Sequence, residues 1–108
     1  MTFEEFQAWT KNQDVETGWE RLTTVQLLSH LFEEAGELAT EINKTNGRKV
    51  HSNTKAEIKN EVMLEAADVI QNVFSIIDGF DIEYSDLIKA LKAKNLKWKS
   101  KMKKTKNV

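Results

Sequence analysis

Residues 23–46 read TTVQLLSHLFEEAGELATEINKTN, and their apolar positions recur with the spacing of an α-helix. These positions are Leu27, Leu28, Leu31, Phe32, Ala35, Leu38, Ala39 and Ile42. The Asn46-Gly47 pair is a common C-terminal stop for a helix. The stretch therefore predicts a helix from near Thr23 to near Asn46, followed by a polar loop over residues 47–53.

A second long helix is predicted after this loop. Thr54 and Glu57 have the spacing of a capping box, and Asp78-Gly79 closes the helix. Its apolar face consists of Val62, Ala66, Val69, Ile70, Val73, Ile76 and Ile77. Two long amphipathic helices joined by a short loop favour antiparallel packing.

Two further helices flank this pair. Thr2 and Glu5 form another capping box and predict a helix over about residues 3–11, followed by a polar connector to about Leu22. Asp81 or Ser85 can cap a last helix that extends to about Lys103. Strand signals are weak because Val and Ile recur with helical spacing. We expect one all-α domain over residues 1–108, an antiparallel four-helix bundle with a frayed lysine-rich end at about 99–108.

The composition excludes several classes of protein. The 108 residues contain no cysteine, so neither a disulfide framework nor a thiolate metal site is possible. The charged start of the chain does not resemble a signal peptide, and no apolar run has the roughly 18 residues of a membrane span. A cytoplasmic protein without a membrane partner is therefore expected.

The charges are segregated along the chain although the net charge is only −1. All 17 acidic residues lie at or before Asp86, where only seven basic residues occur, which gives this part a charge of about −10. From Lys89 to Lys106 there are nine lysines and no acid. The lysines can be the solvated end of a helix, where the helix dipole favours them. Alternatively, they can face phosphate groups or a nucleic acid.

Acidic residues recur at helical spacing on both long helices. Glu34 and Glu37 are three residues apart, and Glu65 and Asp68 repeat this spacing, with Asn72 one turn later. Both sets border the apolar faces, so antiparallel packing brings them to one groove. Carboxylates that meet in this way repel each other, and a divalent cation removes the repulsion. An all-oxygen donor set is the one that Mg²⁺ prefers.

The same acids permit a simpler interpretation. They can form an ordinary solvated face that pairs with Lys44, Lys55 or Lys59. A di-iron bundle is disfavoured, because it requires Glu-x-x-His pairs and these helices carry Glu-x-x-Glu and Glu-x-x-Asp.

The sequence around these acids resembles the MazG-like nucleotide pyrophosphohydrolases, a family of the all-α NTP pyrophosphatase superfamily. LFEEAGEL at residues 31–38 is similar to the first motif of the family, and EAADVI at residues 65–70 is similar to the second. The 27 residues between Glu37 and Glu65 suit the helix-loop-helix spacing of that family. The likeness extends from the aromatic N-terminal segment to the last helix, where KNLKW spans residues 94–98.

This resemblance implies an activity and a site. The activity is hydrolysis of a nucleoside or deoxynucleoside triphosphate to the monophosphate and pyrophosphate, which clears unwanted or non-standard nucleotides. It requires Mg²⁺, for which Mn²⁺ can substitute. The implied metal ligands and catalytic residues are Glu34, Glu37, Glu65 and Asp68. One of these acids, or Glu33 or Glu61, orients or deprotonates the water.

Further residues are implied to bind the substrate. They are Asn72 near the metal, Lys94, Asn95 and Lys97 toward the phosphates, and Trp9, Trp19 and His30 toward the base. The last helix departs from the family pattern because it contains no arginine, so Lys97 or Lys99 takes that place. The tryptophans can equally be core residues, and His30 can be a plain polar residue at the edge of its helix.

Short relatives of this kind form homodimers or homotetramers. The broad apolar arc of the helix that contains Met63 and Phe74 agrees with a face for such a partner. Gly36 is expected to let the two long helices approach closely, which offsets its cost of about 1 kcal/mol in a helix. A rival hypothesis is a helical interaction module that binds an acidic partner or nucleic acid through its C-terminal lysines. It leaves the paired acids unexplained, so a nucleic-acid partner is not favoured.

Overall fold

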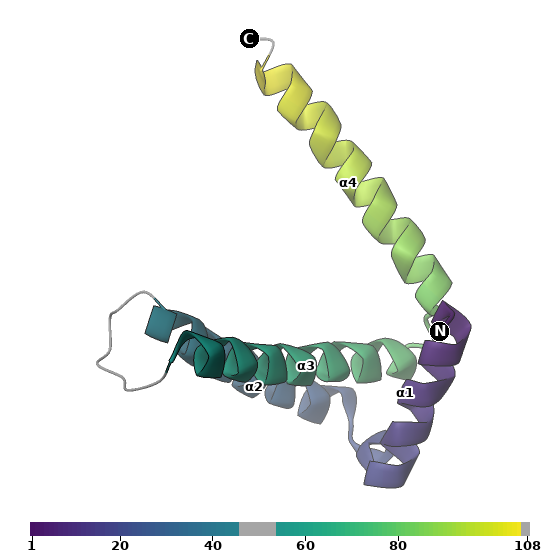
Figure 1. Cartoon of the computed structure of the whole chain (residues 1–108). Coiled ribbons are helices and arrows are strands. Elements are labelled where there is room, and N and C mark those ends of the chain that lie inside the picture. The colour runs from purple at the N-terminus through teal and green to yellow at the C-terminus, as the bar shows by residue number, and fades with distance from the viewer. Residues whose placement is uncertain (46–53, 107–108) are drawn as a thin grey trace.

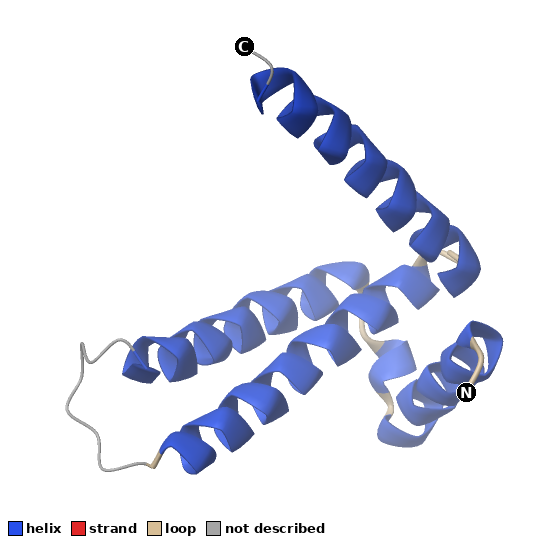
Figure 2. Ribbon diagram, turned by 45° about the horizontal axis from the view of Figure 1, so that its top comes forward, coloured by secondary structure: helices blue, strands red, loops and turns tan. Residues whose placement is uncertain are grey.

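The computed structural model is all-helical over the residues that it describes, 1–45 and 54–106, as the sequence predicts. The elements are α1 (Phe3–Thr17), a short 3₁₀ helix η1 (Trp19–Arg21), α2 (Thr24–Thr45), α3 (Lys55–Gly79) and α4 (Tyr84–Lys106) (Figures 1 and 2). The predicted Asn46-Gly47 stop and the loop at 47–53 lie outside the described residues. No helix in the described part of the chain is long and apolar enough to cross a membrane.

The two long helices lie side by side and run in opposite directions (Figure 1). Thr23 begins α2 by accepting a hydrogen bond from the backbone N–H of Gln26 at 3.2 Å. Thr54 begins α3 in the predicted way, because its side chain accepts from the backbone N–H of Glu57 at 3.2 Å. Leu27 and Ile58 are buried between helices. The boundaries of α2 and α3 therefore agree with the predicted ones to within one residue wherever they are described.

The first helix is longer than predicted, because α1 runs to Thr17 rather than to about Lys11. Its buried side chains are Gln7, Thr10 and Asp14, which have helical spacing but are polar. An apolar periodicity was the signal for the other helices, and this face does not carry one. Gly18 ends α1 in the left-handed region, with φ at 81°, and η1 turns the chain toward α2.

A hydrogen-bonded junction holds α1 against the end of α3 and the start of α4. The hydroxyl groups of Thr10 and Tyr84 lie 2.7 Å apart, and the Gln7 side chain accepts from the backbone N–H of Tyr84 at 3.1 Å. The Gln7 amide also donates to the carbonyl oxygen of Ile82 at 2.9 Å. Burial raises the pKa of the Tyr84 hydroxyl well above its usual range, so this group stays a neutral donor. The buried polar groups of this junction are thus satisfied by hydrogen bonds.

The last helix leaves this junction and extends away from the α2–α3 pair (Figure 1). It begins at Tyr84, so neither predicted cap is used: Ser85 lies inside the helix and Asp81 occupies a left-handed turn with φ at 58°. Among the described elements, α4 packs on α1 and, through Tyr84, on the end of α3, and its side chains from Lys89 to Lys103 are all exposed. The helix reaches Lys106 rather than Lys103. A four-helix bundle is thus not formed within this single chain.

Gly36 does not have the packing role that its sequence context predicts. It is exposed, and a Cβ atom added there would meet no atom of the described structure within 4 Å. The α2–α3 contact lies on a different side of α2, so the expectation of close helix approach at Gly36 is wrong for this chain.

Candidate metal centre

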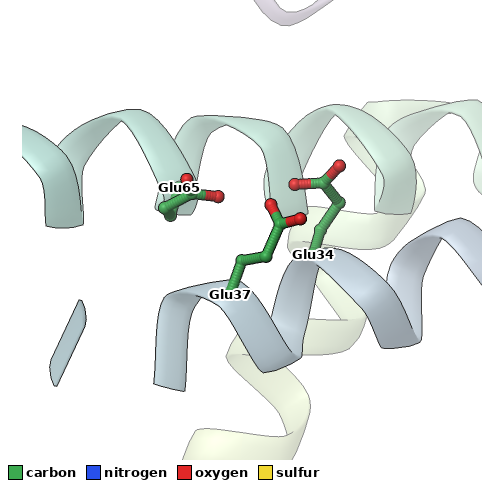
Figure 3. A group of neighbouring side chains, drawn as sticks. All are labelled: Glu34, Glu37 and Glu65. Atoms are coloured by element: carbon green, nitrogen blue, oxygen red, sulfur yellow. The ribbon is translucent and has the colours of Figure 1, made fainter. Parts of the chain in front are cut away.

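Three carboxylates from two helices meet at the centre of the α2–α3 pair. Glu34 and Glu37 lie one turn apart on α2, and Glu65 faces them from α3 (Figure 3). Each contributes a carboxylate oxygen to a group in which all oxygens lie within 4.8 Å of one another. The structure therefore brings together three of the four predicted metal ligands.

The environment of two of these carboxylates, Glu34 and Glu65, disfavours their charged form. Burial, reinforced by the negative charges of Glu37 and Asp68, raises the pKa of Glu34 to about 7. Burial also raises the pKa of Glu65, followed by its contact with Glu37. The site thus concentrates negative charge that a cation would stabilise.

The hydrogen bonding of the cluster is incomplete in a way that suits a cation. Oε2 of Glu34 and Oε2 of Glu65 are buried and have no hydrogen-bond partner in the described structure. The ion pairs of the described residues involve other acids, Lys44 with Glu41 at 3.0 Å and Lys89 with Asp86 at 3.9 Å. Pairing with Lys44, Lys55 or Lys59 therefore does not explain the three acids of the cluster. Buried oxygens without partners are costly unless something binds them.

Mg²⁺ fits this donor set, because it is a hard cation that prefers oxygen ligands and keeps waters or phosphates in its remaining positions. Glu34, Glu37 and Glu65 are the residues that would hold it. When bound, the ion would neutralise phosphate charge and polarise a phosphoryl group.

The fourth predicted ligand, Asp68, lies beside the cluster rather than within it. Its side chain is exposed, but its charge contributes to the raised pKa values of both Glu34 and Glu65. Asn72 is almost fully buried, and its amide donates to the backbone oxygen of Asp68 at 2.9 Å. Its Oδ1 has no hydrogen-bond partner among the described residues. Asn72 therefore presents an unused acceptor one turn beyond Asp68.

Three other acids of the region differ in their setting. Glu33 is exposed on α2, whereas Glu61 is half-buried one turn before Glu65. Glu41 was not predicted as a site residue, yet its charge adds to the field at Glu65. Its spacing of four residues from Glu37 is the signal that would have found it.

The aromatic candidates lie at the α1–α2 end of the molecule. The rings of Trp19 and His30 are in contact, with centroids 5.1 Å apart, so His30 packs on a tryptophan. Trp9 is 47% exposed and stacks on Phe6. Trp9 and Trp19 nevertheless line one small pocket together.

The phosphate-binding candidates are not joined to the carboxylates in this chain. Lys94, Asn95 and Lys97 are exposed on α4, and α4 contacts α3 only through its first residue, Tyr84, among the described elements. Figure 1 shows that the helix that carries them projects away from the α2–α3 pair.

Comparison with known proteins places the chain beside one relative. No protein-family model matches it, and no solved structure matches it significantly. The uncharacterized protein YvdC of Bacillus subtilis (strain 168) is 30% identical over 95 residues, which are 83% of this chain and 89% of the relative. The chain therefore belongs to the same family as YvdC.

Proposed function

We propose that this protein is a Mg²⁺-dependent nucleoside triphosphate pyrophosphohydrolase of the MazG type, which releases a nucleoside monophosphate and pyrophosphate. The observation that carries the proposal is the group of three carboxylates, two of which, Glu34 and Glu65, have a buried oxygen without a hydrogen-bond partner among the described residues. The proposed role is to clear unwanted nucleotides in the cytoplasm. The choice of the α–β bond rests on the resemblance of residues 31–38 and 65–70 to the MazG motifs.

The residues of the chain have distinct parts in this proposal. In this proposal the metal ion is held by Glu34, Glu37 and Glu65. Asp68 completes the coordination shell of the ion, either directly or through a water molecule. The half-buried Glu61 and the unpaired oxygen of Asn72 are the groups available to position the attacking water. Positioning and charge neutralisation are the main requirements of phosphoryl transfer.

The test is a screen of all ribo- and deoxyribonucleoside triphosphates with Mg²⁺, with Mn²⁺ and with excess chelator. We expect pyrophosphate release that stops in chelator and that falls at least a hundredfold in Glu34→Gln. Glu4→Gln, which removes an exposed acid far from the cluster, is the matched control. Full activity in chelator contradicts the metal mechanism, and nucleoside diphosphate as the first product contradicts the proposed bond.

We further propose that the active assembly is a homodimer or homotetramer in which α4 packs on another copy. The chain has a radius of gyration of 17.7 Å, whereas a compact domain of this length has about 13 Å. Its accessible surface of 8523 Å² exceeds the roughly 6,100 Å² of a folded protein of this mass. That excess is larger than the roughly 800 Å² that each partner buries in a standard interface.

Charge and exposed apolar groups support this arrangement. The α4 residues from Lys89 onward carry nine lysines and no acid, while the rest of the chain has a charge of about −10. Phe32 on α2 is 70% exposed, Met63 on α3 is 60% exposed, and Trp98 on α4 is 63% exposed. A partner's α4 laid on the α2–α3 pair covers such groups and brings Lys94, Asn95 and Lys97 toward phosphates at the carboxylates.

Mixing two inactive variants tests whether the site is shared. A Glu34→Gln chain keeps its lysines, and a Lys94→Ala, Lys97→Ala chain keeps its carboxylates. If α4 serves the partner's site, the mixture regains about one quarter of wild-type activity, because half of the dimers are mixed and each has one intact site. No regained activity in a mixture that light scattering shows to be dimeric contradicts a shared site.

A second candidate function is supported by the exposure of α4 alone. A lysine-rich helix with an exposed Trp98 is typical of a module that binds an acidic partner or a nucleic acid. Deletion of residues after Lys99 separates the two functions. An interaction module loses its partner, whereas the hydrolase keeps most of its activity.

A further inference from the structure

A second polar site lies on α3 just beyond the carboxylate cluster. Asp14 of α1 is only 8% exposed, and its Oδ1 accepts hydrogen bonds from the Ser75 hydroxyl at 3.0 Å and from the Gln71 amide at 3.4 Å. Both bonds go to the same oxygen, and the structure gives Oδ2 no hydrogen bond among the described residues. Burial raises the pKa of this carboxyl, so its charge is stabilised less than that of an exposed aspartate.

Asp14 lines two adjoining pockets. One has a volume of about 200 Å³ and is formed by Trp9, Gln13, Asp14, Thr17, Trp19 and Gln71. The other, of about 390 Å³, lies on the side of Ser75 and Asp78, and Asp14 and Trp19 belong to both. The smaller pocket combines two tryptophans with a buried carboxylate. It is too small for a whole drug-sized ligand, whose pockets start near 300 Å³, but it suits one planar ring.

The distance along α3 relates this pocket to the carboxylate cluster. Gln71 follows Asp68 by three residues, which is a rise of about 4.5 Å, and Ser75 follows Glu65 by ten residues, or about 15 Å. Around the helix, at 100° per residue, Ser75 lies about 80° and Gln71 about 120° from Glu65. A nucleotide whose phosphates bind at Glu34, Glu37 and Glu65 would have to follow the surface of α3 through this rise and rotation for its base to reach Asp14.

We propose that Asp14 determines substrate specificity by accepting a hydrogen bond from the exocyclic amino group of a nucleobase held between Trp9 and Trp19. This inference rests on the proposed hydrolysis of nucleoside triphosphates. Cytosine and adenine carry this amino group at the edge where uracil and thymine present a carbonyl oxygen, whereas guanine has a carbonyl oxygen at the matching position and its amino group at C2. A carbonyl oxygen placed against Oδ2 leaves the carboxylate unpaired and brings two acceptors together. A ring in this pocket gains contact area from the two indoles, and this contribution does not depend on the base.

Ser75 and Gln71 are positioning residues in this arrangement. Their hydrogen bonds to Oδ1 hold the carboxylate so that Oδ2 is left for the ligand. Because both are on α3, they also fix the distance between the base and the metal ligands on the same helix. The selection of the base is thus tied to the alignment of the phosphates.

The most direct test compares the hydrolysis of CTP with that of UTP. These two nucleotides differ at this edge of the base and share the sugar and the phosphates. We expect the wild-type protein to have a higher kcat/KM for CTP by ten- to a hundredfold, the range for losing a hydrogen bond to a charged group. In Asp14→Asn the ratio of the two kcat/KM values falls toward one, mainly because kcat/KM for CTP decreases. Glu16→Gln, an exposed acid on the same helix, keeps the wild-type ratio. The rise in melting temperature with Mg²⁺ is unchanged in Asp14→Asn, because the cluster is intact.

Two results overturn the inference: equal use of CTP and UTP by the wild-type protein, or an equal loss for both in Asp14→Asn. The wild-type comparison needs no variant, so it decides the matter even if Asp14→Asn does not fold. Absence of any hydrolysis contradicts the proposed function instead. In that case quenching of tryptophan fluorescence by CMP but not by UMP supports the base site, and no difference between them removes it.

Discussion

At the scale of single residues, the carboxylate cluster lowers the stability of the metal-free protein and, for the same reason, favours the binding of a cation. Glu34 is held where its charged form is disfavoured, and its neighbours Glu37 and Asp68 add to this effect. The same arrangement offers two buried oxygens without partners to a cation. A site that is unfavourable without metal and favourable with it is what a metal-dependent enzyme requires.

The metal-free protein should therefore become less stable as pH rises. The folded-state pKa of Glu34 is about 7, above its usual value of 4.5, so the folded form holds the proton more tightly than the unfolded chain. The contribution to stability is complete below pH 4.5 and is lost as pH rises through 7. Thermal melts in chelator should show a falling melting temperature between pH 5 and pH 8. Glu34→Gln should flatten this part of the curve, and a wild-type curve that rises over the same range would contradict the assignment.

Asp68→Asn tests the fourth predicted ligand, which lies beside the cluster. The change keeps the shape and removes one of the charges that repel Glu34 and Glu65. We expect stability without metal to stay the same or to rise, and activity to fall at least a hundredfold. Mg²⁺ raises the melting temperature of the folded wild type by mass action, and this rise should be smaller in the variant. Thermal melts of both proteins with and without Mg²⁺ measure the rise. An equal shift in both would remove Asp68 from the site.

At the scale of the elements, α2 and α3 are the helices that a reader of the sequence can place. Thr54 caps α3 as expected, and α2 begins where it is predicted to, with Thr23 as its cap. The end of α1 was missed because Thr10 and Asp14 bury a polar face, which carries no apolar period. Asp14 was overlooked as a site residue for the same reason: a lone acid in a polar segment looks like a surface residue. Its burial depends on Ser75 and Gln71, which are more than fifty positions away along the chain.

Gly36→Ala should stabilise α2. The glycine costs about 1 kcal/mol in a helix relative to alanine, and no described atom lies within 4 Å of the added Cβ. We expect the free energy of unfolding to rise by about 0.5–1 kcal/mol in urea titrations. Thr54→Ala is the matched change in the opposite direction, since it removes the cap of α3 and should cost about 1 kcal/mol. If Gly36→Ala is destabilising, another copy of the chain packs closely against that position.

At the scale of the whole molecule, the course of α4 is the feature that the sequence could not supply. The lysines at 89–103 are exposed, and no packing on another described helix fixes the direction of α4 beyond its first turns. Three carboxylates of the proposed site come together within one chain, whereas Lys94, Asn95 and Lys97 do not join them. The spacing of the acids is sufficient to predict that the carboxylates meet, because α2 and α3 are neighbours in the chain and pack on each other. The position of the α4 residues depends on contacts that a single sequence does not specify.

The extended shape predicts that stability depends on protein concentration. If α4 packs on a second copy, dilution lowers the melting temperature because dissociation and unfolding are linked. We expect a rise in melting temperature over a hundredfold increase in concentration, accompanied by a larger mass in light scattering. A chain that ends at Ile88, before the first of the α4 lysines, should lose this dependence. A melting temperature that is the same at all concentrations would indicate that the single chain is the stable unit.

The attachment of α4 through its first turns alone also has a consequence for the cell. A helix of 23 residues is about 34 Å long, and Tyr84 fixes it at one end. If the phosphate-binding lysines must come from another copy, newly made chains are inert until they meet. The total activity then grows with the square of the protein concentration when the protein is scarce. Once most copies are paired, the activity grows in proportion to the concentration. At low abundance, a twofold change in gene dosage would then change the proposed clearance of nucleotides about fourfold.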